Sequence, residues 1–485
     1  MNGKFRTTIR NMSGFRWPAA ALAVAVAFMG SAGAVAVAVP AAAAACTDNW
    51  VGPASGTSSW ATGADWSAGI PNGTSVACIK KAGTYTVAIT TQGGAAAAVV
   101  VGGAASGTQT LRIEGVNFPT SQPSQVLKGG VLSITPTSSA SAEISGSGTA
   151  GVTIAAGGKL SSAGTANTAG IEVPLVSNGT VTLAAASNND GYATTDKGTF
   201  TVASGATFTF SGTGFTHSGG KLTVHGAFNG ENTFTQSGGT EAGNPVAQHA
   251  GTFVDSAGTG SFTAYQATIE GTIPAGQKVT NLASPGNSND TIGTASAGVT
   301  VDGTLTCQTA NSTICSFSTN GNWPGITVAR GGTLSATGPG DAAAGTYINL
   351  DANIDVKAGG KLTIANPATM VNTYTLANSG TWQVTATGNI TIGGNCAVTS
   401  TGTIGVTVGS KVTAPGGTID TTNISNFTAT GTLAVHTAGT KGGGAVITTR
   451  SGLDAAFSKL SFTPPTDTYT VTYTPTQVEL TPVAS

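Results

Sequence analysis

Two acids in the chain have a spacing that glycoside hydrolysis could use. Asp351 and Asp355 lie in the run Leu-Asp-Ala-Asn-Ile-Asp-Val. On a strand, residues four apart share a face, so both carboxylates could point outward together. Hydrolysis needs carboxyl groups roughly 5–9.5 Å apart, whereas four strand residues span roughly 13 Å. The pair is too wide, and a site would need a further acid: Asp302, Asp341 or Glu270. We interpret these residues as isolated acids that solvate the outer face.

Other catalytic chemistries have less support in the sequence. His217 and His225 flank a Gly-Gly-Lys segment in a Thr-rich region, and we interpret such imidazoles as surface or turn residues. Arg112, Arg330 and Arg450 are each solitary, so a lyase site with grouped acids and a base is not indicated. Motifs for a nucleophile elbow, a zinc-binding helix or a phosphate loop do not occur. We assign no catalytic residue, no metal ligand and no cofactor, and an enzyme is the less favoured interpretation.

The five cysteines predict two disulfides and one remaining thiol. Cys307 and Cys315 flank a short loop, and Cys46 and Cys78 bracket a Trp-rich segment. Export would permit both pairs to oxidise. Cys396 is then left over, either as a buried, inert thiol or as an intermolecular bridge. No C-x-x-C pair occurs and the histidines do not lie beside the cysteines, so a zinc site is not expected.

A cluster of tryptophans could bind a ligand or close a core. Trp50, Trp60 and Trp66 are half of all the tryptophans in the chain. Aromatic rings at this density form either a sealed core end or an exposed platform for polysaccharide. The first interpretation, a cap over the open end of a stack of strands, is favoured. The glycan platform stays open as the alternative.

The elements that would position these residues are short strands. In residues 198–240, pieces such as Gly-Thr-Phe-Thr-Val and Gly-Lys-Leu-Thr-Val alternate hydroxyl and apolar residues. This period of two is typical of a strand with one buried face. Glycines interrupt every run before a long strand can form. Helix-forming stretches are almost absent after residue 46, with 453–460 the one short candidate.

The same phrase recurs along most of the chain, for example at Gly130, Gly179, Gly298, Gly360 and Gly431. Degenerate repeats of one strand and one turn predict a coiled stack, because a single short strand cannot bury its apolar face alone. We predict an all-β, single-stranded parallel β-helix (β-solenoid) at 81–440, with an N-terminal cap at 46–80 and C-terminal capping strands at 441–485. A sandwich or propeller is the rival fold.

Flat rows of threonine could also bind ice or a crystalline polysaccharide. Thr207-Phe-Thr209 and Thr233-Phe-Thr235 fit such a row locally. A row needs the same register on many successive coils, and the repeat spacing is uneven. We therefore do not expect extended threonine rows.

Both ends of the chain resemble a known group of proteins. The Trp-rich N-terminal motif includes Trp66-Ser-Ala-Gly-Ile-Pro71, and the end reads Tyr469-Thr-Val-Thr-Tyr followed by Val478-Glu-Leu. This combination resembles secreted bacterial parallel β-helix repeat proteins, which are autotransporter-passenger-like and adhesin-like. The resemblance implies a right-handed solenoid. Those proteins usually carry an Asp soon after the Pro, where this chain has Thr74 and Ser75.

The N-terminus and the charge limit location and partners. Residues 1–45 have a basic segment, an apolar segment and an Ala-rich cleavage site, which predicts a signal peptide; an uncleaved membrane anchor is the alternative. Four basic residues would leave with it, so 15 basic and 20 acidic residues remain, a net charge of −5. Without basic clusters, we expect no nucleic-acid binding and, after cleavage, no membrane contact.

These observations favour a secreted, extracellular, non-catalytic solenoid that acts as a structural or adhesive surface protein. Its partners would be extracellular polysaccharide or cell-surface components. The alternatives are a carbohydrate-active enzyme, either a polysaccharide lyase or a glycoside hydrolase, on the same scaffold, and a polysaccharide-binding protein.

Overall fold

The computed structural model describes residues 45–147, 149–164, 167–282, 288–292, 297–309, 315–319, 324–338, 348–365, 368–370, 374–385, 390–392, 396–408, 419–421, 426–437, 444–449, 453–455, 457–465 and 469–483. The predicted signal peptide, apart from Ala45, lies outside these residues, and so does Asp341. No helix in the described part of the chain is long and apolar enough to cross a membrane.

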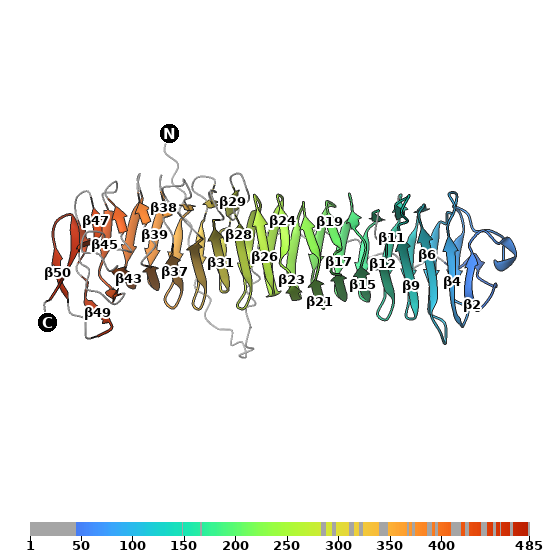
Figure 1. Ribbon diagram of the computed structural model, residues 1–485, viewed down its shortest axis with the longest axis horizontal. Helices are drawn as coiled ribbons and strands as arrows, with labels where there is room; N and C mark the ends of the chain where they lie inside the picture. The colour runs from blue at the N-terminus through green and yellow to red at the C-terminus, as the bar shows by residue number, and fades with distance from the viewer. Residues whose placement is uncertain are drawn as a thin grey trace, which may run out of the picture. The chain divides into compact units, whose positions relative to one another are not determined.

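The strands follow one another in chain order along the long axis of Figure 1, each stacked on a strand of the previous coil. A full coil contributes one strand to each of three faces. The first face is a 16-stranded sheet. Its strands are β7 (Asn117–Thr120), β10 (Ala142–Gly146), β13 (Ala169–Glu172), β16 (Ser187–Asn189), β19 (Thr207–Phe210), β22 (Ala227–Gly230), β24 (Val246–His249), β26 (Ser261–Tyr265), β28 (Lys278–Leu282), β31 (Thr304–Gln308), β34 (Thr333–Thr337), β37 (Lys361–Ile364), β40 (Thr381–Val384), β43 (Thr403–Val408), β46 (Thr432–Thr437) and β49 (Lys459–Thr463).

The second and third faces, with two C-terminal strands described below, make up a 35-stranded sheet. The second face contains β1 (Asp48–Asn49), β3 (Val76–Ile79), β5 (Ala98–Val101), β8 (Pro123–Val126), β11 (Gly151–Ile154), β14 (Leu175–Ser177), β17 (Ala193–Asp196), β20 (Gly214–His217), β29 (Ser288–Ile292), β32 (Cys315–Ser318), β35 (Ile348–Asp351), β38 (Ala368–Met370), β41 (Ile390–Ile392), β44 (Ile419–Thr421) and β47 (Gly444–Thr449).

The third face contains β2 (Ser55–Ser59), β4 (Thr84–Ile89), β6 (Gln109–Glu114), β9 (Gly130–Thr135), β12 (Lys159–Ser162), β15 (Thr180–Leu183), β18 (Thr199–Val202), β21 (Lys221–Val224), β30 (Val299–Val301), β33 (Ile326–Val328), β36 (Ile354–Val356), β39 (Thr375–Asn378), β42 (Ala397–Ser400), β45 (Asn426–Ala429) and β48 (Leu453–Ala455). Three longer strands continue from the second face into the third: β23 (Phe234–Gly243), β25 (Thr252–Thr259) and β27 (Thr268–Ile273).

Neighbouring coils pair in parallel and in register, which confirms the predicted β-helix and is inconsistent with hairpin-paired sandwich sheets. On the first face, Val246 pairs with Phe262 and Phe262 with Val279. A step from Val246 to Phe262 takes 16 residues, whereas the step from Leu305 to Leu334 takes 29. The turns absorb this difference, so an uneven repeat in sequence still gives an even stack of strands.

The interior is a continuous core of the inward residues of all three faces. Phe215, Phe234 and Phe253 occupy one column on successive coils, and their ring centroids lie 5.4 Å and 6.0 Å apart in stacked pairs. All three side chains are at most 1% exposed. Burial of such a side chain stabilises the fold by roughly 1.5–3 kcal/mol. The core therefore grows with each coil, and no coil needs a core of its own.

Glycines at the turns let successive coils approach closely. Gly220 has a φ of 68°, and a Cβ there would lie 1.8 Å from the carbonyl oxygen of Gly198 on the previous coil. Only glycine fits this position without displacing the backbone. The recurrent glycine of the repeated segment thus marks a contact between coils as well as the boundary of a strand.

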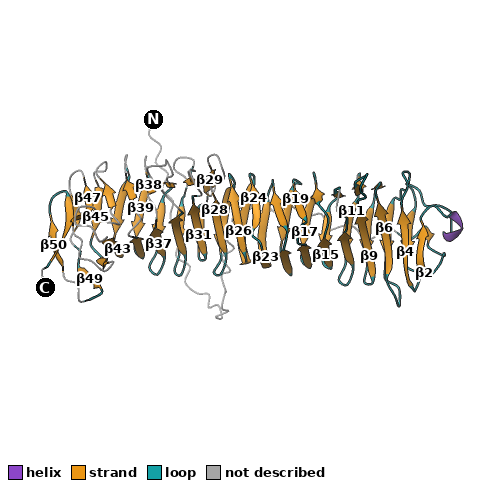
Figure 2. Cartoon of the chain, in the orientation of Figure 1, coloured by secondary structure: helices purple, strands orange, loops and turns teal. Residues whose placement is uncertain are grey.

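The C-terminal end closes the stack with an antiparallel hairpin. β50 (Tyr469–Tyr473) pairs with β51 (Gln477–Pro482), and β51 pairs antiparallel with β47. The prediction of a short helix at 453–460 is wrong. The segment instead supplies β48 and the start of β49, because Leu453 and Leu460 align with Phe427 and Leu433 of the previous coil. Figure 2 shows strands along the whole stack and one short 3₁₀ helix, Gly63–Asp65, at the end of the stack that contains β2.

Candidate functional sites inside and outside the solenoid

The three N-terminal tryptophans seal the first coils. Trp50, Trp60 and Trp66 are 3%, 2% and 4% exposed. Trp66 packs edge-on against the other two, with centroid distances of 5.1 Å and 4.8 Å. Its indole N–H donates to the Trp60 carbonyl at 2.9 Å. Ring faces buried in this way cannot stack on a sugar, so these residues do not form an exposed glycan platform. They act as the cap, because an open end of the core would otherwise contact water.

The cysteines pair as expected. Cys46 is bonded to Cys78 with an S–S distance of 2.02 Å, and Cys307 to Cys315 at 2.00 Å. The first bond ties the start of the described chain to β3, and the second joins β31 to β32 inside the core. Cys396 is a buried free thiol whose sulfur lies 3.7 Å from the Met370 carbonyl oxygen. Burial raises the pKa of this thiol, which makes it a poor nucleophile.

Asp351 and Asp355 do not share a strand. Asp351 ends β35 on the second face and Asp355 lies in β36 on the third face, with a turn at Ala352 between them. The Asp355 carboxylate, 40% exposed, pairs with the Lys357 ammonium at 2.5 Å. The strand geometry assumed for the sequence is therefore wrong here, because the coil turns a corner within the run.

The remaining acids do not complete a hydrolytic site. Asp302 directly follows β30, whose residue Val301 aligns with Val328 and then with Val356, so two coils separate it from Asp355. Glu270 pairs with Val254 in the second-face part of β27. A hollow beside Asp355 has a volume of about 220 Å³, below the roughly 300–1,000 Å³ of typical ligand pockets. In the described part of the chain, no three His, Cys, Asp or Glu residues are grouped to hold a metal.

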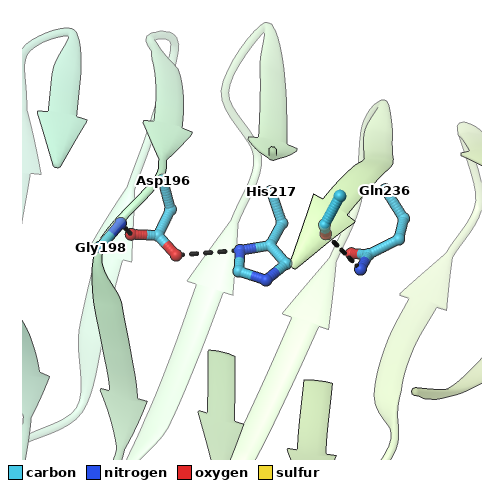
Figure 3. A network of polar contacts seen from close by, with 5 residues as sticks. Asp196, Gly198, His217 and Gln236 are labelled. Carbon is cyan, nitrogen blue, oxygen red and sulfur yellow. Dashed lines mark hydrogen bonds and ion pairs between the residues drawn. The ribbon is translucent and has the colours of Figure 1, made fainter. Parts of the chain in front are cut away.

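A buried Asp–His pair lies inside the solenoid (Figure 3). His217 Nδ1 and Asp196 Oδ2 are 2.9 Å apart, and both side chains are fully buried. The second Asp196 oxygen accepts a hydrogen bond from the Gly198 N–H at 3.2 Å. The expectation that His217 is a surface or turn residue is wrong. It ends β20 in an inward position, directly above Asp196, which ends β17.

The pair belongs to a longer column of buried polar residues. Ser177, Asp196, His217, Gln236 and Asp255 pair in register on five successive coils, and each is 0% exposed. We call these five residues the interior polar column. They occupy the last inward position of the second face, next to the bend into the third face. The amide of Gln236 turns back at this bend and donates to the Gly238 carbonyl at 2.8 Å.

Burial makes the column hard to ionise at its C-terminal end. Desolvation raises the pKa of Asp255 to about 8, and the Asp255 carboxyl accepts a hydrogen bond from the Gln277 amide at 2.6 Å. Desolvation also raises the pKa of Glu241 to about 7. The hydrogen bond that the Glu241 carboxylate accepts from the Ser261 N–H lowers this pKa and partly offsets the desolvation. Raised pKa values often mark active sites. These side chains face a closed interior, however, so they hold adjacent coils together and cannot reach a substrate.

The outer surface of the first face carries a regular array of side chains. Over nine successive strands, β26 to β49, two outward rows pair in register. The lysine row is Ser261, Lys278, Thr304, Thr333, Lys361, Thr381, Thr403, Thr432 and Lys459. The hydroxyl row is Thr263, Thr280, Thr306, Ser335, Thr363, Gln383, Gly405, Ala434 and Ser461.

The argument that uneven spacing prevents a common register is therefore wrong, although of these nine strands only β31 has threonine in both rows. The turns take up the length differences, so hydroxyl residues 26 and 29 positions apart stand on adjacent strands, as Thr280, Thr306 and Ser335 do. The two local Thr-x-Thr pairs belong to different faces, since Thr207 and Thr209 lie in β19 and Thr235 in β23. A signal for the rows is present in the sequence, but it requires the strands to be aligned first.

Comparison of the chain with models of protein families, with curated proteins and with solved structures gives no match.

Proposed function

We propose that this protein is a secreted, non-catalytic β-solenoid that acts as an extracellular structural or adhesive surface protein. The observation that carries the proposal is the in-register outer surface of the first face, where two outward rows, made mostly of hydroxyl residues and including three lysines, run over nine strands. Such a surface offers the same kind of shallow contact many times along the stack.

The two disulfides and the N-terminal sequence support an extracellular location. Structural disulfides form and persist in oxidising compartments, and the Cys46–Cys78 bond follows directly after the predicted cleavage site. The resemblance of both chain ends to secreted bacterial β-helix proteins supports the same location. Buried acids that stay out of reach of solvent support a scaffold over an enzyme, because Asp196 and Asp255 are fully buried.

The fold suits this role for a mechanical reason. In the described residues, the strands of one coil pair with strands of the adjacent coils, so the stack behaves as a nearly one-dimensional array with evenly spaced outer residues. Weak contacts repeated along such an array add up to firm attachment, since the first contact raises the effective concentration for the next. An adhesive surface therefore needs no deep pocket at any single coil.

Cells that make the protein test the proposal directly. An antibody against the solenoid should label intact cells or the medium, and mass spectrometry of the mature protein should place its N-terminus at or near Cys46. Gene deletion should weaken attachment of the cells to a surface, and the wild-type gene should restore it. A protein that stays inside intact cells, with residues 1–45 attached, would contradict the proposal.

A further inference from the structure

We propose that the first face from β26 to β49 is a docking surface for an acidic polysaccharide. This inference rests on the proposed adhesive function and names its partner class. In this inference, the lysine row and the hydroxyl row together recognise a polysaccharide that carries carboxylate or sulfate groups as well as hydroxyl groups.

The charged side chains on the strands of this surface are all positive. None of the nine strands contains an acid, whereas Lys278, Lys361 and Lys459 are exposed in the lysine row. The same coils carry acids on the other faces, at Asp351 in β35 and Asp355 in β36. Among the described residues, no carboxylate forms an ion pair with these three lysines. Lys357, by contrast, pairs with Asp355. These ammonium groups remain available to a negatively charged partner.

The first face changes character along its length. Its N-terminal strands carry acids instead: Glu143 lies in β10 and Glu172 in β13. Desolvation raises the pKa of Glu172, and repulsion from the nearby carboxyl groups of Asp190 and Glu143 raises it further. A polyanion would be repelled from β10–β16 and attracted to β28–β49. The charge pattern thus limits the docking surface to one part of the face.

Glycines precede most strands of this surface. The residue before each of β31, β34, β37, β40, β43 and β46 is glycine: Gly303, Gly332, Gly360, Gly380, Gly402 and Gly431. A Cβ at each of these positions would lie within 2.5 Å of a backbone carbonyl oxygen of the previous coil. This close approach fixes the start of each strand against the previous coil, which keeps the lysine row and the hydroxyl row in register.

The spacing of the lysines favours an extended partner. Three strand steps separate Lys278 from Lys361 and four separate Lys361 from Lys459. At about 4.8 Å per step, these separations are about 14 Å and about 19 Å. Only a chain that runs along the stack meets all three charges. The threonine and serine hydroxyls between them can donate to and accept from sugar hydroxyls. A purely phosphate-based partner would use these hydroxyls less fully, and a neutral polysaccharide would offer no charge to the lysines.

Binding to a matched pair of polymers tests the inference. Polygalacturonate carries one carboxylate per sugar, and fully methyl-esterified polygalacturonate has the same backbone without the charges. The full chain should bind immobilised polygalacturonate, and raised salt should weaken this binding because the contacts are exposed. The triple variant K278S/K361S/K459S should bind about tenfold more weakly, since three exposed charge contacts are lost. The matched control K80S/K128S/K197S removes three exposed lysines elsewhere and should bind like the wild type.

The outcomes separate the inference from the proposed function. Equal binding to both polymers, or equal loss in the two triple variants, would overturn the inference. Binding to anionic lipid vesicles or DNA as tight as that to polygalacturonate would also overturn it, because the hydroxyl row would then add no specificity. A protein that labels the cell surface and supports attachment, yet binds no acidic polysaccharide, would overturn the inference and leave the proposed function standing.

Discussion

Replacement of Asp255 by Asn should remove a pH dependence of stability that the wild-type chain shows. Asp255 is 0% exposed, and desolvation raises its pKa to about 8 in the folded chain, compared with an ordinary value of about 3.9. Between these two pH values the folded state holds a proton on Asp255 and the unfolded state does not. The wild-type chain is therefore most stable, with respect to this group, below pH 4, and it loses that stability as the pH rises towards 8.

The slope follows from the single proton. One proton bound only by the folded state lowers the unfolding free energy by about 1.4 kcal/mol per pH unit. Between pH 5 and pH 7 the wild type should lose about 2.7 kcal/mol relative to D255N. The Asn side chain has the same shape and can still pair with the Gln277 amide, whose N–H now donates to Asp255. Glu241 is present in both proteins, so its own pKa shift cancels.

Hydrogen exchange and urea unfolding can measure this difference. Protection of the β25 and β27 amides, compared between the two proteins at each pH, reports the coils around residue 255 even if the solenoid unfolds in stages. A control replacement, D355N, changes a carboxylate that is 40% exposed and solvated in the folded chain. A stability difference between wild type and D255N that stays constant from pH 5 to pH 7 would refute the burial argument.

Three further changes test the packing of the stack. Phe215→Ala removes a fully buried ring stacked on Phe234 and should lower the unfolding free energy by about 3–5 kcal/mol in denaturant titrations; a loss below 1 kcal/mol would contradict the core assignment. C46A/C78A opens a loop of sequence separation 32 and should destabilise the first coils by roughly 3–4 kcal/mol, seen as faster proteolysis there and not at β40. Gly220→Ala should impair folding more than Gly205→Ala, although both have positive φ, because only Gly220 meets a neighbouring carbonyl; equal melting temperatures would argue against that contact.

The sequence predicts the fold well because the fold depends on a local rule. A typical strand has an alternation of period two and a glycine directly before it. Segments such as Gly360-Lys-Leu-Thr-Ile contain both features within five residues. The disulfide pairs can also be predicted from the sequence, since Cys307 and Cys315 lie close together in the chain. Burial of the tryptophan cluster follows from the need to close the core, which was the favoured interpretation.

The features that depend on register could not be predicted in the same way. Asp196 and His217 meet only because the length of the intervening coil, which contains β18 and β19, places them on adjacent coils, and a longer or shorter turn within it would pair other residues. The lysine and hydroxyl rows were missed for the same reason. Asp351 and Asp355 were misplaced because a coil corner falls between them. A single sequence gives the strands, but the lengths of irregular turns decide which side chains share a row.

The most direct test of the account is to measure attachment and bond cleavage in one experiment. The purified protein is incubated with a panel of acidic and neutral polysaccharides, and the fraction of protein retained is measured together with the polymer length and the number of new reducing ends. We predict retention on an acidic polymer whose length and reducing ends stay unchanged. Shortened polymer, with cleavage abolished in D351N or D355N, would show that the scaffold carries an enzyme.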